Sequence, residues 1–527
     1  MASFSSSSSS LLSVLLLFVV AAASVAEPSG AATLGLDFYH RFSDPVRRWA
    51  ESSGHRGAAW PRHGTAEYFA ALAHHDRALH RRSLADTSGQ LTFADGNSTY
   101  RISSLGYLHY ALVALGTPNV TFLVALDTGS DLFWVPCDCK QCAPTTSPRF
   151  GNLVFSIYSP KLSSTSQNIP CNSSLCDAQN ACSGATSSCP YLVQYLSDNT
   201  SSSGILVEDV MYLTTEASRS KVVQAPIIFG CGQVQTGSFL DGAAPNGLFG
   251  LGLENISVPS ILSSKGFASD SFSMCFGNDG IGRINFGDKG SSDQEETPLN
   301  IHSGHPSYNI SLTGVEIGNT STSTAFSAIV DSGTSFTYLA DPIYTQITRR
   351  FNAQIQESRH QLDPSLPFEY CYDLSSNQTT IQLPVINFIT KGGSVFPVND
   401  SIIVISSTQN QYGYCLAIVK SNNVNIIGQN FMNGLRIVFD RERLILGWKK
   451  FNCYSVEDSS TLPVNRNSSA SPPTGAFAPS SYTPEATKGS RNTTQVTVLT
   501  PRTNNSSHSN AMTSILLLLL LLVPAFF

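Results

Sequence analysis

Two segments of the chain repeat one pattern, in which an apolar run ends in Asp, then Thr or Ser, Gly, and Ser or Thr. They are FLVALDTGSDLFWV around Asp127 and SAIVDSGTSFTYL around Asp331. A single Asp-Thr-Gly is common by chance and usually makes an ordinary turn after a strand. Two aligned copies predict instead a chain of two similar halves, each presenting one carboxylate at the end of a strand.

Each copy is followed by a second matched element, in which two apolar residues precede Gly. These elements are GLFGLG at residues 247–252 and NIIGQNF at residues 425–431. Gly permits a tight turn after the Asp strand, and a later apolar strand packs beside that strand as a buried platform. Each half is therefore expected to repeat the same internal plan.

From Tyr107 onward the chain consists of short β-branched and aromatic runs broken by Gly, Pro, Asn and Ser, such as TFLVAL, APIIFG, FSMCFG, GRINFG and RIVFDRERLILGW. Many short strands of this kind predict an all-β fold with few helices. We expect helices in VPSILSSKG from Val258, in DPIYTQITRRFNAQIQE from Asp341 and in NFMNGLRI. A length of 527 residues suits two lobes plus non-globular segments.

The N-terminal region reads as two removable segments. Residues 1–26 are predicted to be a signal peptide, because an apolar run at 11–23 precedes the small residues Ser24 and Ala26. A buried helix is the alternative. Residues 27–95, which are rich in Arg, are predicted to be a propeptide. Within them EYFAALAHHDRALHRR indicates an amphipathic helix, with Tyr68, Leu72 and Ala78 among its apolar positions, although a solvated helix fits as well.

After Cys453 the composition shifts to Ser, Thr, Pro and Asn, too poor in apolar residues to fold, which predicts a glycosylated stalk over residues 454–505. The chain then ends in ILLLLLLLVPAFF, shorter than the span of about 20 apolar residues that a membrane needs. Small residues precede it, so residues 506–527 are predicted to be a GPI-anchor signal with attachment at Asn505 or, nearly as well, Ser506. The expected location is the extracellular face of the plasma membrane.

Charge and cysteines narrow the class of protein. Only 13% of residues are charged and the formal net charge is -6, which argues against a nucleic-acid partner. The 12 cysteines and the Asn-X-Ser/Thr sequons from Asn97 to Asn505 suit a disulfide-bonded glycoprotein of the secretory pathway. A zinc site at Cys137, Cys139 and Cys142 is the alternative for the closely spaced thiols, but secretion favours disulfides.

With the entry strand YALVALGTP and the exit segment VFDRERLILGW, these motifs occur in the order found in one family. The chain resembles the pepsin-like aspartic proteases, especially the plant nepenthesin-like members with a cysteine-rich insertion, over roughly residues 100 to 453. The resemblance implies a bilobal fold, with an N-terminal lobe at 96–285 and a C-terminal lobe at 286–453. Asp127 and Asp331 would lie side by side in the cleft between them.

The resemblance also implies the chemistry. Two carboxylates about 3 Å apart cannot both ionise cheaply and share one proton, for which aspartic proteases are the standard example. The ionised member would activate a water as general base, and the protonated member would donate a hydrogen bond to the scissile carbonyl. The substrate would be a protein or peptide, no metal or cofactor is required, acidic pH would favour activity, and a monomer is the default.

Further residues take roles from the same resemblance. Thr128 and Ser332 would brace the two loops, Ser130 and Thr334 would hydrogen-bond the outer carboxylate oxygens, and Gly129 and Gly333 complete the loops. In the flap hairpin YLVQYLSDNTSSSGILVEDV, Tyr195 holds the flap-tyrosine position and Tyr191 is the fallback. Trp134 would hydrogen-bond that tyrosine; as an alternative it is an ordinary buried aromatic.

The cysteine-rich insertion is expected to hold two nested disulfides, Cys171 with Cys189 and Cys176 with Cys182. In the rest of the protease region we expect Cys371 with Cys415 and Cys275 with Cys453. Spacing alone does not determine these pairings.

Other functions remain open. A non-catalytic binding or inhibitor protein on the same fold is the main alternative to a protease, although both Asp residues, Ser130 and Thr334 are present. A GPI-anchored adhesion glycoprotein would explain the stalk and sequons but not the Asp motifs. A serine hydrolase lacks a GxSxG elbow with partners in order. If the propeptide inhibits, a Lys or Arg across the cleft would pair with the ionised dyad, and acid would release it.

Overall fold

The computed structural model describes most of the two expected lobes and part of the region before them. The predicted signal peptide, most of the predicted stalk and the predicted anchor signal lie outside the described residues. The described residues are 33–453, apart from 53–59, 81–106, 144–154, 178, 196–199, 216–220, 241–242, 245, 278–279, 302–305, 361–365, 376–379 and 407–411, together with 493–497.

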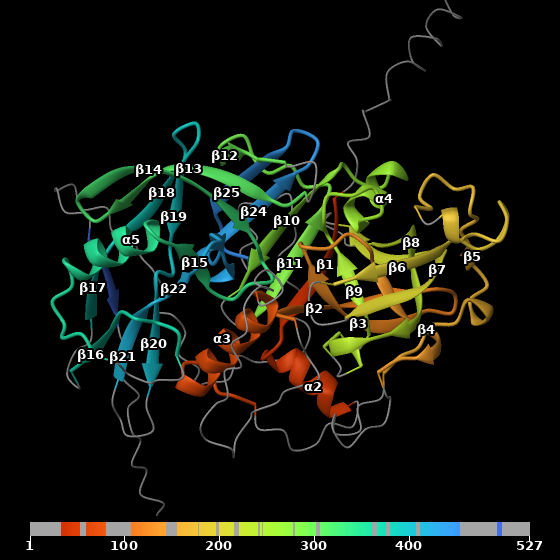
Figure 1. The fold of residues 1–527 in the computed structure, drawn as a ribbon, viewed down its shortest axis with the longest axis horizontal. Coiled ribbons are helices and arrows are strands. Elements are labelled where there is room, and N and C mark those ends of the chain that lie inside the picture. The colour runs from red at the N-terminus through yellow and green to blue at the C-terminus, as the bar shows by residue number, and fades with distance from the viewer. Residues whose placement is uncertain are drawn as a thin grey trace, which may run out of the picture.

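The molecule is built of β-sheets arranged in two halves, as Figure 1 shows. The largest sheet has 14 strands and runs from the C-terminal strands through the middle of the molecule into the N-terminal half. In sheet order its strands are β12 (Glu295–Pro298), β25 (Ile445–Lys450), β24 (Leu435–Asp440), β10 (Ser271–Phe276), β11 (Ile281–Phe286), β1 (Leu34–His40), β2 (His109–Leu115), β3 (Val120–Asp127), β9 (Leu248–Gly250), β4 (Trp134–Gln141), β8 (Val222–Gln235), β7 (Ser201–Thr215) and β5 (Gln167–Asn168), with β6 (Pro190–Gln194) paired to β7.

Smaller sheets make up the C-terminal half. The seven-stranded sheet contains β19 (Val395–Val398), β18 (Ile386–Thr390), β13 (Asn309–Ile317), β14 (Thr320–Val330), β23 (Ile426–Ile427), β15 (Thr337–Ala340) and β22 (Ile418–Ser421). The others pair β16 (Cys371–Leu374), β21 (Tyr412–Leu416) and β20 (Ile402–Ser406), and β17 (Thr380–Pro384) with β26 (Thr493–Thr497). The all-β, two-lobed fold predicted from the sequence is confirmed. Strand β26 differs from expectation, because this Thr-rich piece of the predicted stalk pairs with a lobe.

Helices are few in the described residues. The α-helices are α2 (Asp44–Ser52), α3 (Ala66–His80), α4 (Val258–Ser264) and α5 (Ile343–Asn352), and short 3-10 turns are η3 (Pro160–Leu162), η4 (Gln179–Ala181), η5 (Gly237–Phe239) and η6 (Gln429–Phe431). The helices predicted from Val258 and Asp341 are confirmed, as is the N-terminal amphipathic helix. The helix predicted in NFMNGLRI is wrong. There η6 stops, Gly434 turns the chain at φ +72°, and the buried residues that follow form β24.

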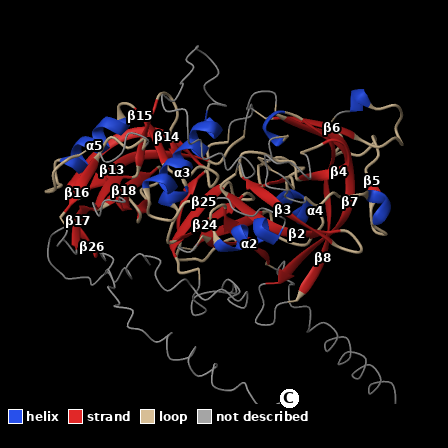
Figure 2. Cartoon of the chain, turned by 90° about the horizontal axis from the view of Figure 1, so that it is seen from below, coloured by secondary structure: helices blue, strands red, loops and turns tan. Residues whose placement is uncertain are grey.

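The N-terminal segment is part of this architecture, which the sequence did not predict. Strand β1 lies between β11 and β2 and pairs with both. Its inward residues Leu34, Leu36 and Phe38 are buried, and Asp37 is 2.6 Å from Arg283 on β11. Helix α3 lies between the two halves in Figure 1 and again near the centre of Figure 2.

All 12 cysteines form disulfides, and two of the predicted pairings are corrected. Cys371–Cys415 and Cys275–Cys453 are present as expected, and Cys137–Cys231 and Cys139–Cys142 involve the thiols considered for zinc. The nested pairing of the insertion is wrong: the bonds are Cys171–Cys182 and Cys176–Cys189.

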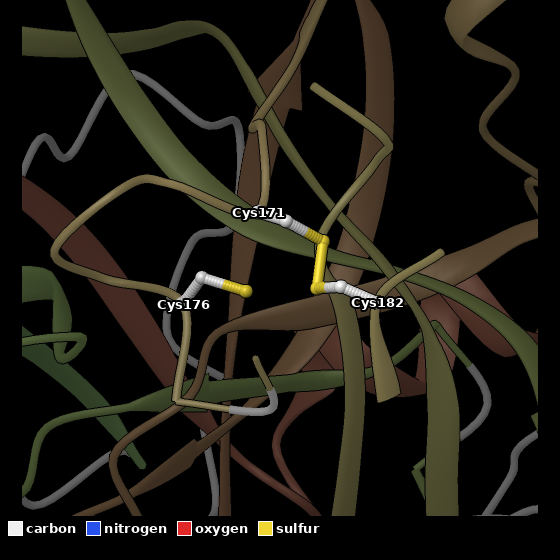
Figure 3. Close-up of side chains that lie close together, drawn as sticks. All are labelled: Cys171, Cys176 and Cys182. Carbon is white, nitrogen blue, oxygen red and sulfur yellow. A yellow bond between two sulfur atoms is a disulfide. The ribbon is translucent and has the colours of Figure 1, made fainter. Parts of the chain in front are cut away.

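The local strand register explains that correction. Pro170 pairs antiparallel with Ser188, which sets Cys171 opposite Ser187 and Cys189 opposite Ile169. The two cysteines therefore lie at opposite ends of the short ladder, not across from each other. Figure 3 shows the sulfur–sulfur bond of Cys171 and Cys182, with Cys176 beside it.

Candidate active site

Asp127 is delivered by the end of β3, where this strand runs beside β9. The two strands pair in parallel from Ala125 with Leu248 to Asp127 with Gly250, and the Asp127 carbonyl accepts the Leu251 amide at 2.8 Å. Parallel neighbours are buried on both faces, which explains the unbroken apolar run before the Asp. A Cβ on Gly250 would lie 2.1 Å from the Asp131 carbonyl oxygen, so this turn needs glycine.

Asp331 occupies the equivalent place in the second half. It follows β14, which pairs in parallel with β23, and its amide donates to the Ile427 carbonyl at 3.1 Å. A Cβ on Gly428 would lie 2.2 Å from the Phe336 carbonyl oxygen. The apolar-apolar-Gly elements therefore meet the Asp loops in both halves, in the arrangement expected of an internal repeat.

The two carboxylates have matched hydrogen bonds. The Oδ1 of Asp127 accepts the Gly129 amide at 3.0 Å and its Oδ2 accepts the Ser130 hydroxyl at 2.7 Å. The Oδ1 of Asp331 accepts the Gly333 amide at 2.8 Å and its Oδ2 accepts the Thr334 hydroxyl at 2.6 Å. Each carboxylate thus accepts the amide of the residue two positions on and the hydroxyl of the residue three positions on.

One contact joins the two loops. The Thr128 hydroxyl donates to Oδ1 of Asp331 at 3.4 Å, a long hydrogen bond that runs from one Asp motif to the carboxylate of the other. Since Thr128 directly follows Asp127, this contact brings the two loops together. Ser332 is buried next to Asp331. The structure therefore assembles the six loop residues and both carboxylates at one place between the halves.

The flap candidate is bonded to the strand that follows the first Asp loop. The Nε1 of Trp134 donates to the Tyr195 hydroxyl at 2.9 Å, and the ring of Phe239 stands edge-on to both aromatic rings. Burial raises the pKa of Tyr195 well above its ordinary value, and the nearby charge of Asp127 raises it further. Tyr191 instead shares a hydrogen bond with Ser202 inside the β6–β7 hairpin. Tyr195 therefore fits the flap position better than Tyr191.

Helix α3 contacts the second Asp loop, which sequence reasoning missed. The Nε2 of His75 is 3.0 Å from the Gly333 carbonyl oxygen. Asp76 is fully buried and its two oxygens accept the amides of Ser335 at 2.8 Å and Phe336 at 3.0 Å. The only signal in the sequence is the polar pair itself within an amphipathic helix, and such a pair usually faces solvent.

Two other features of the described residues bear on possible sites. The sulfurs of Cys171, Cys176 and Cys182 lie within 4.8 Å of one another, but all three are in disulfides and cannot offer thiolates to a metal. A cavity of about 300 Å³ contains neither carboxylate of the pair and is lined by Leu253, Glu254, Asp270, Ile301, Pro306, Arg441 and Leu444.

Comparisons with known proteins agree on one family. Aspartyl protease family protein 1 of Arabidopsis thaliana is 52% identical over 462 residues, covering 87% of this chain and 88% of the relative. Aspartic proteinase-like protein 1 of the same plant is 38% identical over 85% of this chain and 86% of its own length. Aspartic proteinase nepenthesin-2 of Nepenthes gracilis is 28% identical over 65% and 77%.

Family models and solved structures also match the chain, and these carry the names of xylanase inhibitors and seed globulins. The xylanase inhibitor N-terminal family matches residues 109–288 and the xylanase inhibitor C-terminal family matches residues 307–450. Conglutin gamma, a basic 7S globulin from lupine seeds, has the same fold with a TM-score of 0.53 at 21% identity, over 69% of this chain and 96% of its own. Basic 7S globulin from soybean gives 0.51 at 20%, over 68% and 95%.

The two-lobed β fold and the repeated Asp loops define a protein of the pepsin-like class. The chain belongs to the plant pepsin-like family of aspartic proteases, to which the nepenthesin-like relatives also belong. Among the described residues, no helix has the length and apolar character that a membrane span requires. The apolar runs at 11–23 and at the C-terminus lie outside those residues.

Proposed function

We propose that the protein is an aspartic endopeptidase that hydrolyses peptide bonds of protein substrates, with Asp127 and Asp331 as its catalytic pair. The matched hydrogen bonding of the two carboxylates, together with the Thr128 bond between their loops, is the observation that carries this proposal. A binding protein needs neither the equivalence nor the link. A catalytic pair that shares one proton needs both.

The proposed reaction proceeds by acid–base catalysis. The ionised carboxylate takes a proton from a water held between the pair while that water attacks the scissile carbonyl carbon. The protonated carboxylic acid donates a hydrogen bond to the carbonyl oxygen and stabilises the tetrahedral intermediate. The loop hydroxyls and amides hold the two carboxylates in position, and the two carboxylates share one proton. The mechanism requires the pair to hold one proton between its two carboxylates.

Tyr195 is proposed to order the substrate. The flap hairpin would close over the bound peptide and exclude water from the reacting carbonyl. Because Trp134 holds the Tyr195 hydroxyl, the flap ring is oriented before substrate arrives. Preorganisation of this kind lowers the entropic cost of reaching the transition state.

The second candidate is a non-catalytic inhibitor or binding protein on the same fold. It is favoured by the matched families, which are named for xylanase inhibitors, and by the globulins of similar fold. Against it stand both Asp residues and all four of their loop donors. A protein that had lost catalysis would have no need to keep the pair.

We also propose the cellular setting that the sequence predicts. The signal peptide, the sequons and six disulfides support export and glycosylation, and the C-terminal apolar tail supports a GPI anchor at Asn505. The low charge fits a protein that binds no nucleic acid, and a monomer is the default. Treatment of cells with phosphatidylinositol-specific phospholipase should release the protein; retention on the membrane would rule out the anchor.

Cleavage of an unfolded protein substrate from about pH 3 to pH 7 tests the enzyme, using protein freed of residues 27–95. Activity should favour acid, be blocked by pepstatin, and be lost in Asp127→Asn and in Asp331→Asn. The surface variant Asp293→Asn, at an exposed ion pair with Lys449, is the matched control and should remain active. No activity in fully processed, folded wild-type protein would favour the binding-protein function.

A further inference from the structure

The N-terminal segment joins the body of the protein through a pair of buried histidines. In the antiparallel register of β1 and β2, His40 lies directly opposite His109, and the centroids of their rings are 5.6 Å apart. Their exposed fractions are only 8% and 4%. His40 belongs to the predicted propeptide and His109 to the body, so the pair spans the boundary between them.

Aromatic rings enclose this pair and leave no room for a hydration shell. Phe38 and Phe276 each lie 5.2 Å from the His109 ring, and Phe42 and Tyr68 lie 5.6 and 6.1 Å from the His40 ring. The Nδ1 of His40 accepts the Phe42 amide at 3.2 Å, a bond that requires this nitrogen to be unprotonated. His40 is therefore built to be neutral, whereas the His109 ring hydrogen-bonds the backbone of Ser332, which partly opposes the lowering of its pKa by burial.

The groups around His40 do not offset the positive charge that a proton would add to its ring. His40 faces the positive charge of buried Arg41 and the further histidines His63 and His75. Burial lowers the pKa of His40 well below its ordinary value and that of His109 to about 3. Two imidazolium ions directly opposite each other in a ladder would repel one another, and burial would deny both of them water.

Asp76 is the carboxylic acid that interacts electrostatically with Arg41. Its protonation has the opposite effect on docking of the segment from protonation of the histidines. Burial raises the pKa of Asp76 from 3.8 to about 7, so its protonation favours the docked state as the pH falls. Burial lowers the pKa of His109 from 6.5 to about 3, which favours release as the pH falls. Asp76 and His109 therefore act in opposite directions. His40 lies opposite His109, with ring centroids 5.6 Å apart, and beside the positive charge of Arg41, so it adds a second buried group that favours release in acid.

We propose that His40 and His109 form an acid-sensitive joint, whose protonation separates β1 from β2 and frees the Asp331 loop from helix α3. The segment carries both contacts, because α3 follows β1 and places His75 and Asp76 on that loop. The inference rests on the proposed function in treating the segment as an inhibitory propeptide. It places the pH sensor in the strand joint and not in the catalytic carboxylates.

Hydrogen exchange measured by mass spectrometry tests the joint without any need for activity. The full chain carries Asp127→Asn, which prevents self-cleavage, and protection is followed for β1 and α3 from about pH 7.5 to pH 4, corrected for intrinsic exchange. Strand β13 of the C-terminal half is the internal reference. We expect β1 and α3 to lose protection together below about pH 6, while β13 stays protected.

Substitutions locate the sensor. In His40→Gln/His109→Gln, which keeps hydrogen-bonding side chains without the charge, the midpoint of release should fall by about one pH unit or more. His360→Gln changes an exposed histidine and should leave the midpoint unchanged. If the double variant is unprotected at pH 7.5, NMR titration of the wild-type imidazoles replaces it. Their protonation should then coincide with loss of β1 protection.

Two results would overturn the proposal. One is a β1 that stays protected at about pH 4 in the chain with native histidines, and the other is a double variant with an unchanged midpoint. Failure of the proposed protease function would appear differently, as absent cleavage by processed wild-type protein, and would leave the exchange result intact.

Discussion

The indole of Trp134 donates a hydrogen bond to the hydroxyl of Tyr195 at 2.9 Å, joining the strand after the first Asp loop to the tip of the β6–β7 hairpin. Trp134 is fully buried, so its ring gives the flap tyrosine a rigid partner. The contact links the geometry of the Asp127 half to the position of the flap.

Trp134→Phe tests the functional value of this link. Phenylalanine keeps an aromatic ring against Phe239 but cannot donate, so Tyr195 loses one fixed orientation. Loss of a hydrogen bond worth about 1 kcal/mol predicts a fall in kcat/KM of about fivefold to tenfold. The same fall should appear in Tyr195→Phe, and the two changes together should not add, because they remove one bond. If the losses of kcat/KM in the two single variants add up in the double variant, the hydrogen bond between the two side chains does not contribute to activity.

The hydroxyl groups that donate to the two carboxylates should affect the pH at which activity falls off in acid. In Ser130→Ala or Thr334→Val the ionised pair loses one donor, so ionisation becomes harder. The acid limb of the profile of kcat/KM against pH should then move upward by roughly one pH unit. Thr313→Val removes a hydroxyl that bonds only backbone carbonyls on β18 and should leave the profile unchanged. A uniform loss of rate at every pH would indicate a structural role instead.

The sequence predicted the parts of the site that are repeated. The two Asp loops and the two apolar-apolar-Gly elements were found because each motif occurs in both halves of the chain, so each copy supports the interpretation of the other. Strand β1 has no such counterpart, and the contact of His75 with Gly333 joins residues 258 positions apart, which no local pattern reveals. The nested disulfides failed for a related reason, since cysteine spacing is silent on the register of the strands that carry them.

Composition also misled the prediction at NFMNGLRI. Met432, Leu435 and Arg436 are compatible with a helix when taken alone, but Arg436 and Ile437 pair with both β10 and β25. The tertiary ladder overrides a weak local propensity. In the same way Asp76 looks solvated in sequence, because the amides that donate hydrogen bonds to its buried carboxylate belong to a distant loop.

The glycines of the platform elements should be intolerant of a methyl group. In Gly250→Ala and in Gly428→Ala the new Cβ would meet a carbonyl oxygen at 2.1 or 2.2 Å, so the adjacent Asp loop has to shift. We expect at least a hundredfold loss of kcat/KM, since displacement of a reacting group by about 1 Å costs that much. Gly184→Ala, where a Cβ meets nothing within 4 Å, should be silent. Normal activity in either platform variant would show that the loops adjust freely.

The disulfides should differ in their contribution to stability according to the length of chain they close. Cys275–Cys453 spans a separation of 178 residues, whereas Cys139–Cys142 spans 3. A cross-link stabilises mainly by restricting the unfolded chain, so replacing the first pair by Ser should cost roughly 2–5 kcal/mol and the second pair roughly 2 kcal/mol or less. Guanidinium unfolding at neutral pH measures both. Equal losses would mean that local strain in the native state, and not loop closure, governs the contribution of each bond.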